Sequence, residues 1–233
     1  MKEEAKSILL DIVFEAGVKD IKSLDYARRI AYSSEETLFF TYKIANELQS
    51  NEGCFVECGV AAGAQIIAMR VGAPNKTIHA FDSFQGIPSP SNRDDQMPGI
   101  KYLSQQEISN LPEPGKQSLV TTGATAVSVE SFKEHLINSG VGLDNIIIHE
   151  GWFEETIEES DTGPIAILRL DGDLYNSTFV CLQHLFPRVI QHGCVIVDDI
   201  ELPGCKAACD EYFSLINYEP DYKFVSNIAY FYK

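Results

Sequence analysis

Short apolar runs alternate with stretches of helical spacing along the chain after residue 50. The runs that predict strands are Cys54–Val60, Thr77–Phe81, Asn145–His149, Ile165–Leu170 and Cys194–Val197. The stretches that predict helices are Ala64–Met69, Val127–Ile137, Ser177–Ile190 and Lys206–Ile216. Near-continuous apolar strands separated by helices are typical of a parallel sheet covered on both faces. The pattern therefore predicts an α/β domain with a doubly wound, Rossmann-like sheet.

The last two predicted strands, Tyr222–Val225 and Ile228–Tyr232, are separated by only two residues. A gap of that length permits a hairpin but no crossover helix, so these two strands should be antiparallel. Five parallel strands followed by a terminal hairpin make a seven-stranded sheet, which is the arrangement expected of a class I methyltransferase fold.

The first 50 residues differ from the rest because they contain only helical patterns. Apolar residues at helical spacing from Ile8 onward predict a helix that ends at Gly17. A second helix should begin at Ser33, which has capping-box spacing to Glu36, and run to about Leu48.

Residues 85–117 fit neither pattern, because five prolines and three glycines interrupt them. A connection this long in a compact domain is either disordered or functional, and active-site lids are the common functional case. We therefore predict a lid insertion at about 85–117 within a domain that spans residues 51–233. Residues 1–50 form an N-terminal helical extension to that domain.

The formal net charge of −16, from 18 basic and 34 acidic residues, narrows the range of partners. Such a field repels phosphate backbones and anionic membrane surfaces, so neither nucleic acid nor a membrane is expected as a partner. The chain has no apolar run of 18 residues, and its first six residues mix both charge signs, unlike a signal peptide. The expected location is the cytoplasm.

Six cysteines raise the question of disulfides or a zinc site. Their spacings include no C-x2-C pair, and no histidine cluster accompanies them. Most lie inside apolar runs, where reduced cysteine behaves as a small hydrophobic residue. We therefore expect six free thiols.

Two motifs at strand ends predict a cofactor site. In Phe55–Gly63 a strand ends in a glycine-bearing turn that opens a helix, and small residues there let a ligand approach backbone N–H groups. Glu57, two residues before Gly59, suits a ligand with an ammonium group, such as the methionine part of S-adenosylmethionine (SAM). In Ala80–Gly86, Asp82 ends a strand and can accept hydrogen bonds from ribose hydroxyls. The structural alternatives are a tight turn without a ligand and an Asp82 that caps the following turn.

Three aspartates follow the fourth and fifth predicted strands. Asp171 ends the fourth strand, and Asp198 with Asp199 ends the fifth. Because adjacent parallel strands bring their carboxyl ends together, the three carboxylates should lie close to one another and repel. A hard divalent cation with oxygen ligands would relieve this repulsion, and Mg²⁺ is the usual choice. The alternative is that such acids cap the following helices, an interpretation we adopt for Asp173 only.

The acidic motif belongs to a longer series of matches. The sequence resembles the macrocin O-methyltransferase family. In the second half of the chain the matching stretches are Leu170–Thr178, Leu185–Arg188, Gly193, Asp198-Asp199 and Asp210–Phe213. In the first half, Glu57–Val60 and Asp82–Pro88 match the family in the same order. The resemblance extends from about residue 35 to the end. It implies SAM-dependent, Mg²⁺-dependent methylation of a sugar hydroxyl on a natural product.

The resemblance also implies roles for individual residues. Asp171, Asp198 and Asp199 would hold the metal ion. The residues expected to bind SAM are Glu57, Gly59, Val60, Ala61, Gly63, Asp82, Ser83, Phe84, Gly86, Gly151, Trp152 and Asp171. Ala61-Ala62 stands where the family commonly has Trp-Arg, so contacts near the methionine tail should differ. Residues 1–34 and the proline-rich segment 85–117 have no strong match to the family, and they should select the acceptor.

Methyl transfer to a hydroxyl needs an alkoxide-like oxygen in line with the methyl group. Coordination to Mg²⁺ lowers the pKa of a hydroxyl and orients it. We expect Asp171, which lies nearest the SAM methyl in this fold, to act as the base. Related catechol enzymes use a lysine three residues later, but Leu174 occupies that position here. His149 or His79 could serve instead.

Other functions stay open at this point. The acceptor could be a phenol or a nitrogen rather than a sugar. A nicotinamide-dependent oxidoreductase would share the sheet, although its G-x-G-x-x-G fingerprint and a Tyr-x3-Lys pair are missing. A catalytically silent SAM-binding or scaffold protein would lose the acids that are intact here. The sequence does not identify the acceptor, its methylated hydroxyl or the oligomeric state, and a homo-oligomer is possible.

Overall fold

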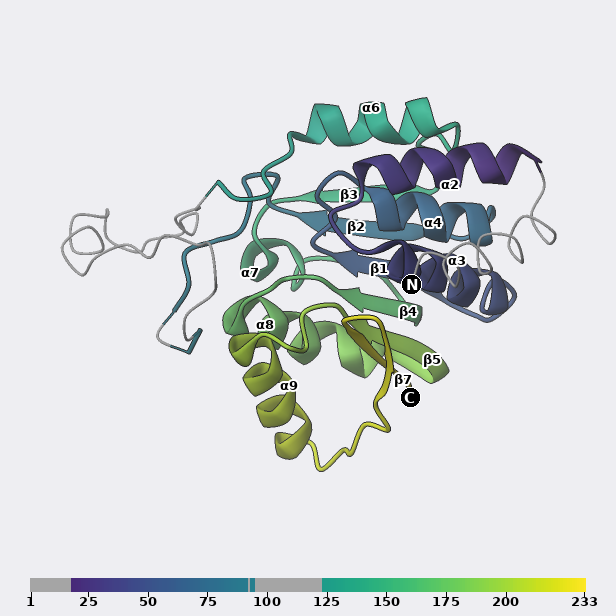
Figure 1. Cartoon of the computed structure of the whole chain (residues 1–233). Helices are drawn as coiled ribbons and strands as arrows, with labels where there is room; N and C mark the ends of the chain where they lie inside the picture. Colours follow the sequence, from purple (N-terminus) through teal and green to yellow (C-terminus); the bar gives the residue numbers. More distant parts are fainter. Residues whose placement is uncertain (1–17, 92, 95–122) are drawn as a thin grey trace.

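The computed structural model of the chain describes residues 18–91, 93–94 and 123–233. At its centre is a seven-stranded sheet with the order β3-β2-β1-β4-β5-β7-β6 (Figure 1). The strands are β1 (Cys54–Cys58), β2 (Ile78–Asp82), β3 (Ile146–Glu150), β4 (Ile165–Leu170), β5 (Val189–Val197), β6 (Lys223–Val225) and β7 (Ile228–Tyr232). Strands β1 to β5 pair in parallel, and β7 pairs antiparallel with both β5 and β6. The predicted doubly wound sheet with a terminal hairpin is confirmed.

Helices cover both faces of this sheet (Figure 1). One face carries α2 (Val18–Ile30), α3 (Glu35–Glu47), α4 (Ala64–Gly72) and α6 (Val129–Ser139). The other carries α7 (Phe153–Thr156), α8 (Tyr175–Leu185), the 3₁₀ turn η1 (Phe186–Arg188) and α9 (Pro203–Leu215). Because α2 and α3 contribute to the same core cluster as β1 and α4, the first helices are packed into the domain.

The pleat of the strands sends alternate residues into two separate cores. Phe55 in β1 belongs to the cluster under α2, α3, α4 and α6, whereas its neighbour Val56 belongs to the cluster under α8 and α9. Glu57 in β1 lies two residues after Phe55, and Arg169 in β4 lies two residues after Ile167. Both side chains therefore point to the same face as Phe55 and Ile167, the face covered by α3 and α4. Two charged residues are thereby buried on adjacent strands.

The predicted helix Ser177–Ile190 is wrong at its C-terminal end. Helix α8 ends at Leu185, η1 contains Pro187, and β5 already begins at Val189. Pro187 lacks the N–H group that a continuing helix would use. Strand β5 is consequently longer than the predicted Cys194–Val197.

The predicted cap of α3 is displaced by one residue. Ser34, not Ser33, is the N-cap, and its Oγ accepts a hydrogen bond of 3.2 Å from the Thr37 backbone N–H. The Ser33 hydroxyl accepts instead from the Gln65 side-chain amide at 2.7 Å. Ser33 therefore faces the start of α4.

Two helices were not predicted as separate elements. Helix α2 is mostly polar and buries only a few apolar side chains, including Leu24 and Ala27, so its periodicity is weak. Helix α7 has four residues, too few for a periodic pattern. The helix expected before Gly17 and residues 92 and 95–117 of the predicted lid lie outside the described residues.

All six cysteines are buried free thiols, so that prediction is confirmed. Within the ranges that the structure describes, no helix combines the length and the apolar character needed to cross a membrane.

Candidate active site

A cavity of about 300 Å³ lies at the carboxyl ends of β1, β2, β4 and β5, where the strand order reverses. The sequence-predicted site residues that line it are Glu57, Gly59, Val60, Ala61, Asp82, Ser83, Gly86, Trp152, Asp171, Asp198 and Asp199. Gly63, Phe84 and Gly151 do not line it. The structure thus brings the cofactor motifs and the acidic motif to one cavity.

The turn after β1 is built for close approach of backbone to backbone. Gly59 has φ +90°, and a Cβ on it would lie 1.8 Å from the carbonyl oxygen of Asp171. Only glycine fits there, because any side chain would push the ends of β1 and β4 apart. This contact fixes the glycine turn directly beside the acidic residue.

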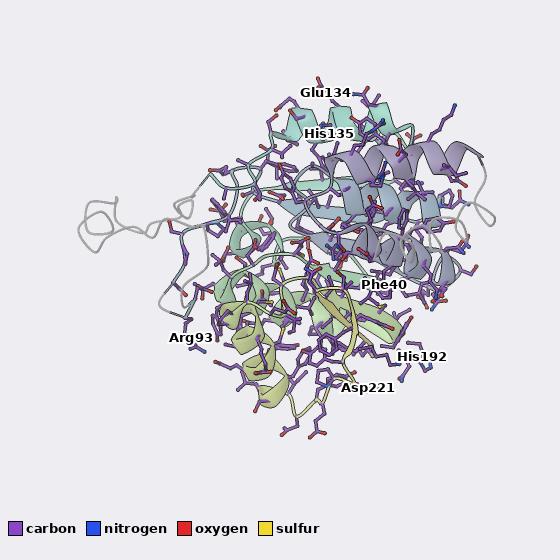
Figure 2. All side chains as sticks on the ribbon, in the orientation of Figure 1. Phe40, Arg93, Glu134, His135, His192 and Asp221 are labelled. Atoms are coloured by element: carbon purple, nitrogen blue, oxygen red, sulfur yellow. The ribbon has the colours of Figure 1, made fainter. Side chains whose placement is uncertain are left out.

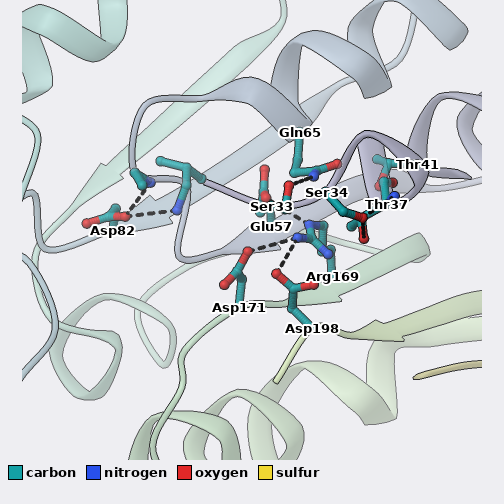
Figure 3. A network of polar contacts seen from close by, with 12 residues as sticks. Ser33, Ser34, Thr37, Thr41, Glu57, Gln65, Asp82, Arg169, Asp171 and Asp198 are labelled. Atoms are coloured by element: carbon teal, nitrogen blue, oxygen red, sulfur yellow. Dashed lines mark hydrogen bonds and ion pairs between the residues drawn. The ribbon is translucent and has the colours of Figure 1, made fainter. Parts of the chain in front are cut away.

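Asp82 closes the same turn from β2. Its Oδ2 accepts hydrogen bonds from the backbone N–H groups of Val60 at 2.8 Å and Ala61 at 2.9 Å (Figure 3). Its Oδ1 accepts from the Phe84 N–H at 2.7 Å. The turn-capping alternative is therefore realised. A carboxylate has about four acceptor positions, so three backbone bonds leave capacity for a ligand hydroxyl.

The three predicted residues outside the cavity wall shape its surroundings. Gly63 is the N-cap of α4, and a Cβ there would lie 2.8 Å from the ring of Phe132. Phe84 packs on that same ring, with the centroids 5.4 Å apart. Gly151 donates its backbone N–H to the carbonyl oxygen of Asp82 at 2.9 Å.

Arg169 joins the acids of three strands. Its side chain is 0% exposed, and its Nε donates to Glu57 Oε1 at 3.1 Å. Its Nη2 donates both to Asp171 Oδ2 at 2.8 Å and to Asp198 Oδ2 at 2.9 Å (Figure 3). The acidic cluster thus has a partial counter-ion within the protein, which the sequence interpretation had not included.

One guanidinium does not neutralise this cluster. Burial, together with nearby acids and despite Arg169, raises the pKa of Asp171 well above its usual value. Burial also raises the pKa of Asp199, with added repulsion from Asp173 and Asp198. The pKa of Glu57 rises to about 7 for the same first reason, desolvation. A cation bound here would stabilise the ionised forms.

Several buried polar atoms at this site have no hydrogen-bond partner among the described residues. They include the acceptors Glu57 Oε2, Asp198 Oδ1 and Asp199 Oδ2, and the donors Trp152 Nε1 and Arg169 Nη1. One oxygen each from Asp171, Asp198 and Asp199 lies within 4.8 Å of the others. Unpaired carboxylate oxygens at this spacing fit a hard divalent cation, and Glu57 Oε2 fits an ammonium group.

The comparison with known proteins is consistent with this geometry. Residues 43–233 match the macrocin-O-methyltransferase (TylF) family, so the match includes every site residue described above. The chain belongs to the macrocin O-methyltransferase family. The resemblance noted in the sequence is confirmed.

Curated relatives of the chain are named as O-methyltransferases. The chain is 33% identical over 166 residues to the demethyldecarbamoylnovobiocin O-methyltransferase of Streptomyces niveus, covering 69% of this chain and 58% of that protein. It is 30% identical over 166 residues to the mycinamicin III 3''-O-methyltransferase of Micromonospora griseorubida, covering 69% and 60%. The matched part is thus less than two thirds of the relatives' length.

Solved structures share the architecture. The O-methyltransferase NovP superposes with a TM-score of 0.69 at 27% identity, covering 86% of this chain and 80% of that one. The calicheamicin methyltransferase CalS11 superposes with a TM-score of 0.64 at 19% identity, covering 99% and 91%, and this likeness concerns the fold alone. The predicted class I methyltransferase fold is confirmed.

In this family member Asp173 is not the helix cap that the sequence suggested. The N-cap of α8 is Leu174, without a side-chain cap bond, and Asp173 has φ +57° and lines the cavity. Burial and the neighbouring Asp198 raise the pKa of Asp173 to about 6. The capping function falls to Asp94, whose Oδ1 accepts from the Tyr175 backbone N–H at 2.6 Å.

Sequence reasoning missed several residues of the cavity wall. They come from the α2–α3 loop, the start of α4, the loop before α6 and the hairpin turn, and include Tyr32, Ser33, Gln65, Thr125 and Asn227. No local pattern marks them, because tertiary packing alone brings them to the cavity. Arg169 did carry a signal, since it is the one charge within the apolar strand Ile165–Leu170.

The two histidines considered as bases lie elsewhere. His79 Nδ1 and His149 Nε2 are 2.9 Å apart, and both rings stack against Phe81. Neither residue lines the cavity. Their placement therefore gives no support to a histidine base.

Proposed function

We propose that this chain transfers a methyl group from SAM to a hydroxyl of a sugar or glycosylated natural product, with Mg²⁺ as a cofactor. The observation that carries the proposal is the single cavity shared by the glycine turn of β1 and the aspartates of β4 and β5. Family membership and the names of the relatives support the reaction class. Three relatives act on novobiocin, tetracenomycin and mycinamicin compounds, according to their names, which supports a glycosylated acceptor.

The cofactor would occupy the β1–β2 side of the cavity. Glu57 Oε2 is buried and lacks a donor among the described residues, so it would accept from the methionine ammonium. The Gly59–Ala61 turn lets the ligand approach the backbone, and the remaining acceptor capacity of Asp82 suits a ribose hydroxyl. Trp152, which also lines the cavity, would offer its indole N–H, which has no partner among the described residues.

The metal would be held by Asp171, Asp198 and Asp199. When bound, Mg²⁺ would lower the pKa of the acceptor hydroxyl and fix its orientation. A metal ion held there would place the acceptor at the ends of β4 and β5, beside the Gly59 turn that lies against the Asp171 backbone.

For the base we keep Asp171 and add Asp173 as a second candidate. Asp171 is engaged by Arg169 at 2.8 Å, whereas Asp173 lines the same cavity without an ion pair to Arg169 in the described structure. Asp173→Asn should abolish turnover yet keep Mn²⁺ binding if Asp173 is the base. If turnover survives this change, Asp171 stays the candidate.

The experiment that tests the function is transfer of a labelled methyl group from SAM. The acceptors would be a panel of glycosides with vicinal hydroxyls, with catechol for a phenol and an aromatic amine for a nitrogen acceptor. Label on a sugar oxygen supports the proposal. Label on catechol or the amine alone would replace the acceptor class, and nicotinamide turnover without methyl transfer would contradict the proposal altogether.

A further inference from the structure

Arg169 is buried behind the cavity wall, on β4 between the strand that carries the cofactor motif and the strand that leads to Asp198. In the parallel register it stands opposite Glu57 of β1 on one side and Ile196 of β5 on the other, two residues before Asp198. The pleat therefore turns Glu57, Arg169 and Asp198 to the same face of three adjacent strands. Figure 3 shows the guanidinium between the carboxylate that faces the cofactor motif and those of the acidic motif.

The hydrogen bonds of Arg169 determine which carboxylate oxygens stay available. Its Nη2 holds the Oδ2 atoms of both Asp171 and Asp198, at 2.8 and 2.9 Å, while Asp198 Oδ1 stays without a partner among the described residues. Its Nε holds Glu57 Oε1 and leaves Glu57 Oε2 in the same unpaired state. In both Glu57 and Asp198, Arg169 therefore binds one carboxylate oxygen and leaves the other available to a ligand.

We propose that Arg169 is a positioning residue that prepares both binding subsites and couples them. This inference rests on the proposed function, because it takes the carboxylates of β4 and β5 to be cation ligands and Glu57 to be a cofactor ligand. The planar guanidinium directs its donors along fixed lines, which an ammonium group does not do. Since the three carboxylates share one guanidinium, a change at Glu57 alters the pairing of Asp171 and Asp198.

A purely neutralising role makes the opposite prediction for cation binding. If Arg169 only offset negative charge, removal of its charge would leave the acids more negative and a divalent cation would bind more tightly. If Arg169 positions the acids, the same removal frees their side chains and the cation binds more weakly. Residues that orient metal ligands from behind typically change metal affinity by about 10–100-fold.

The test measures Mn²⁺ affinity by electron paramagnetic resonance, and affinity for S-adenosylhomocysteine by calorimetry, in the full chain. Arg169→Lys keeps the charge but loses the directed donors, and Arg169→Met removes both. We expect both variants to bind Mn²⁺ about 10–100-fold more weakly than the unaltered protein. Unchanged Mn²⁺ affinity in Arg169→Lys, or tighter binding in Arg169→Met, would overturn the proposal.

Glu57→Gln tests the coupling without replacing Arg169 or a proposed metal ligand. It should weaken Mn²⁺ binding several-fold, because Arg169 then shifts its pairing toward Asp171 and Asp198. Ser83→Ala is the matched control, since Ser83 lines the cofactor side and, within the part of the chain that the structure describes, its hydroxyl bonds with the backbone of residues 85 and 86 and with no acid of the cluster. Its Mn²⁺ affinity should be unchanged, and equal Mn²⁺ affinity in Glu57→Gln and Ser83→Ala would contradict the coupling.

The failure of this inference is distinguishable from failure of the proposed function. If the unaltered protein binds neither Mn²⁺ nor S-adenosylhomocysteine, the proposed function falls and the inference falls with it. If it binds both, and folded Arg169 variants bind equally well, only the inference is overturned. Should Arg169→Met fail to fold, Arg169→Lys and Glu57→Gln decide the question.

Discussion

At the residue scale, the two neighbouring acids after β5 stand in different surroundings. Asp198 is bonded to Arg169 through Oδ2, whereas Asp199 makes no ion pair in the described structure and shares its surroundings with Asp173 and Asp198. Asp198 is therefore part of the fold's internal ion pairing as well as a proposed ligand. Asp199 is a ligand candidate whose charge is opposed by its neighbours.

This difference predicts opposite effects on stability. Asp198→Asn should lower the free energy of unfolding of the metal-free protein by about 1–3 kcal/mol, because Arg169 loses a buried charged partner. Asp199→Asn should leave it unchanged or raise it, because like-charge repulsion is relieved. Both should lose the stabilisation by Mg²⁺. Denaturant titration with and without Mg²⁺ measures this, and equal effects of the two changes would argue against these separate roles.

The buried His79, which lies against the partly buried His149, predicts sensitivity to acid. Burial, with added repulsion from His149, lowers the pKa of His79 from 6.5 to about 4. Between these two values His79 is protonated in the unfolded chain but neutral in the folded chain. The free energy of unfolding should therefore fall as the pH drops from about 6.5 to about 4.

His79→Gln should flatten that part of the pH–stability curve. His192→Gln is the control, because His192 is exposed on β5 at the surface (Figure 2). Melting temperatures between pH 4 and 7 test the prediction. A slope that persists unchanged in His79→Gln would assign the acid sensitivity to other groups.

At the scale of elements, α8 is held at its start by a residue distant in sequence. Asp94 is 4% exposed, accepts from the Tyr175 backbone N–H, and binds Ser91 N–H and Oγ through its other oxygen at 2.8 and 2.7 Å. The same carboxylate lies against α9, because a Cβ on Gly204 would be 2.0 Å from its Oδ1. Asp94 thus joins Ser91 to the first turn of α8.

Loss of this cap should affect both stability and the site. Asp94→Ala is expected to lower the free energy of unfolding by about 1 kcal/mol and to weaken Mn²⁺ binding, since the turn from Asp171 to Leu174 precedes α8 directly. Lys206→Ala is the control, because Lys206 pairs with Asp210 on the exposed side of α9 and should leave both quantities unchanged. Indistinguishable results for the two variants would show that the cap is dispensable.

The elements that the sequence predicted well are those whose burial follows from the pattern of neighbouring residues. The apolar strands β1, β2, β4 and β7 and the two-residue hairpin gap were correct because both depend on neighbouring residues. The predicted end of α8 was wrong because the apolar spacing continues through Phe186 and Val189, although the helix itself stops before Pro187. The predicted cap at Ser33 was wrong by one residue, because the Ser33 hydroxyl bonds with Gln65 of α4 while Ser34 accepts from the Thr37 N–H.

At the scale of the whole molecule, the cavity is closed by segments from both ends of the described chain. Tyr32 and Ser33 reach it from the α2–α3 loop, and Asn227 reaches it from the β6–β7 turn. The two segments touch through Ser34 Oγ and Ser226 Oγ at 3.2 Å. The motifs at the strand ends could be predicted, whereas this rim could not, because residues nearly 200 positions apart come together only in the folded protein.

The most direct test of the central claim is methyl transfer from labelled SAM to a sugar hydroxyl, measured first with EDTA and then after Mg²⁺ is restored. The cofactor motifs lie on β1 and β2, and the proposed metal ligands on β4 and β5. We therefore expect S-adenosylhomocysteine to bind in EDTA, methyl transfer to stop, and transfer to return with Mg²⁺. Transfer that continues undiminished in EDTA would contradict the role proposed for Asp171, Asp198 and Asp199.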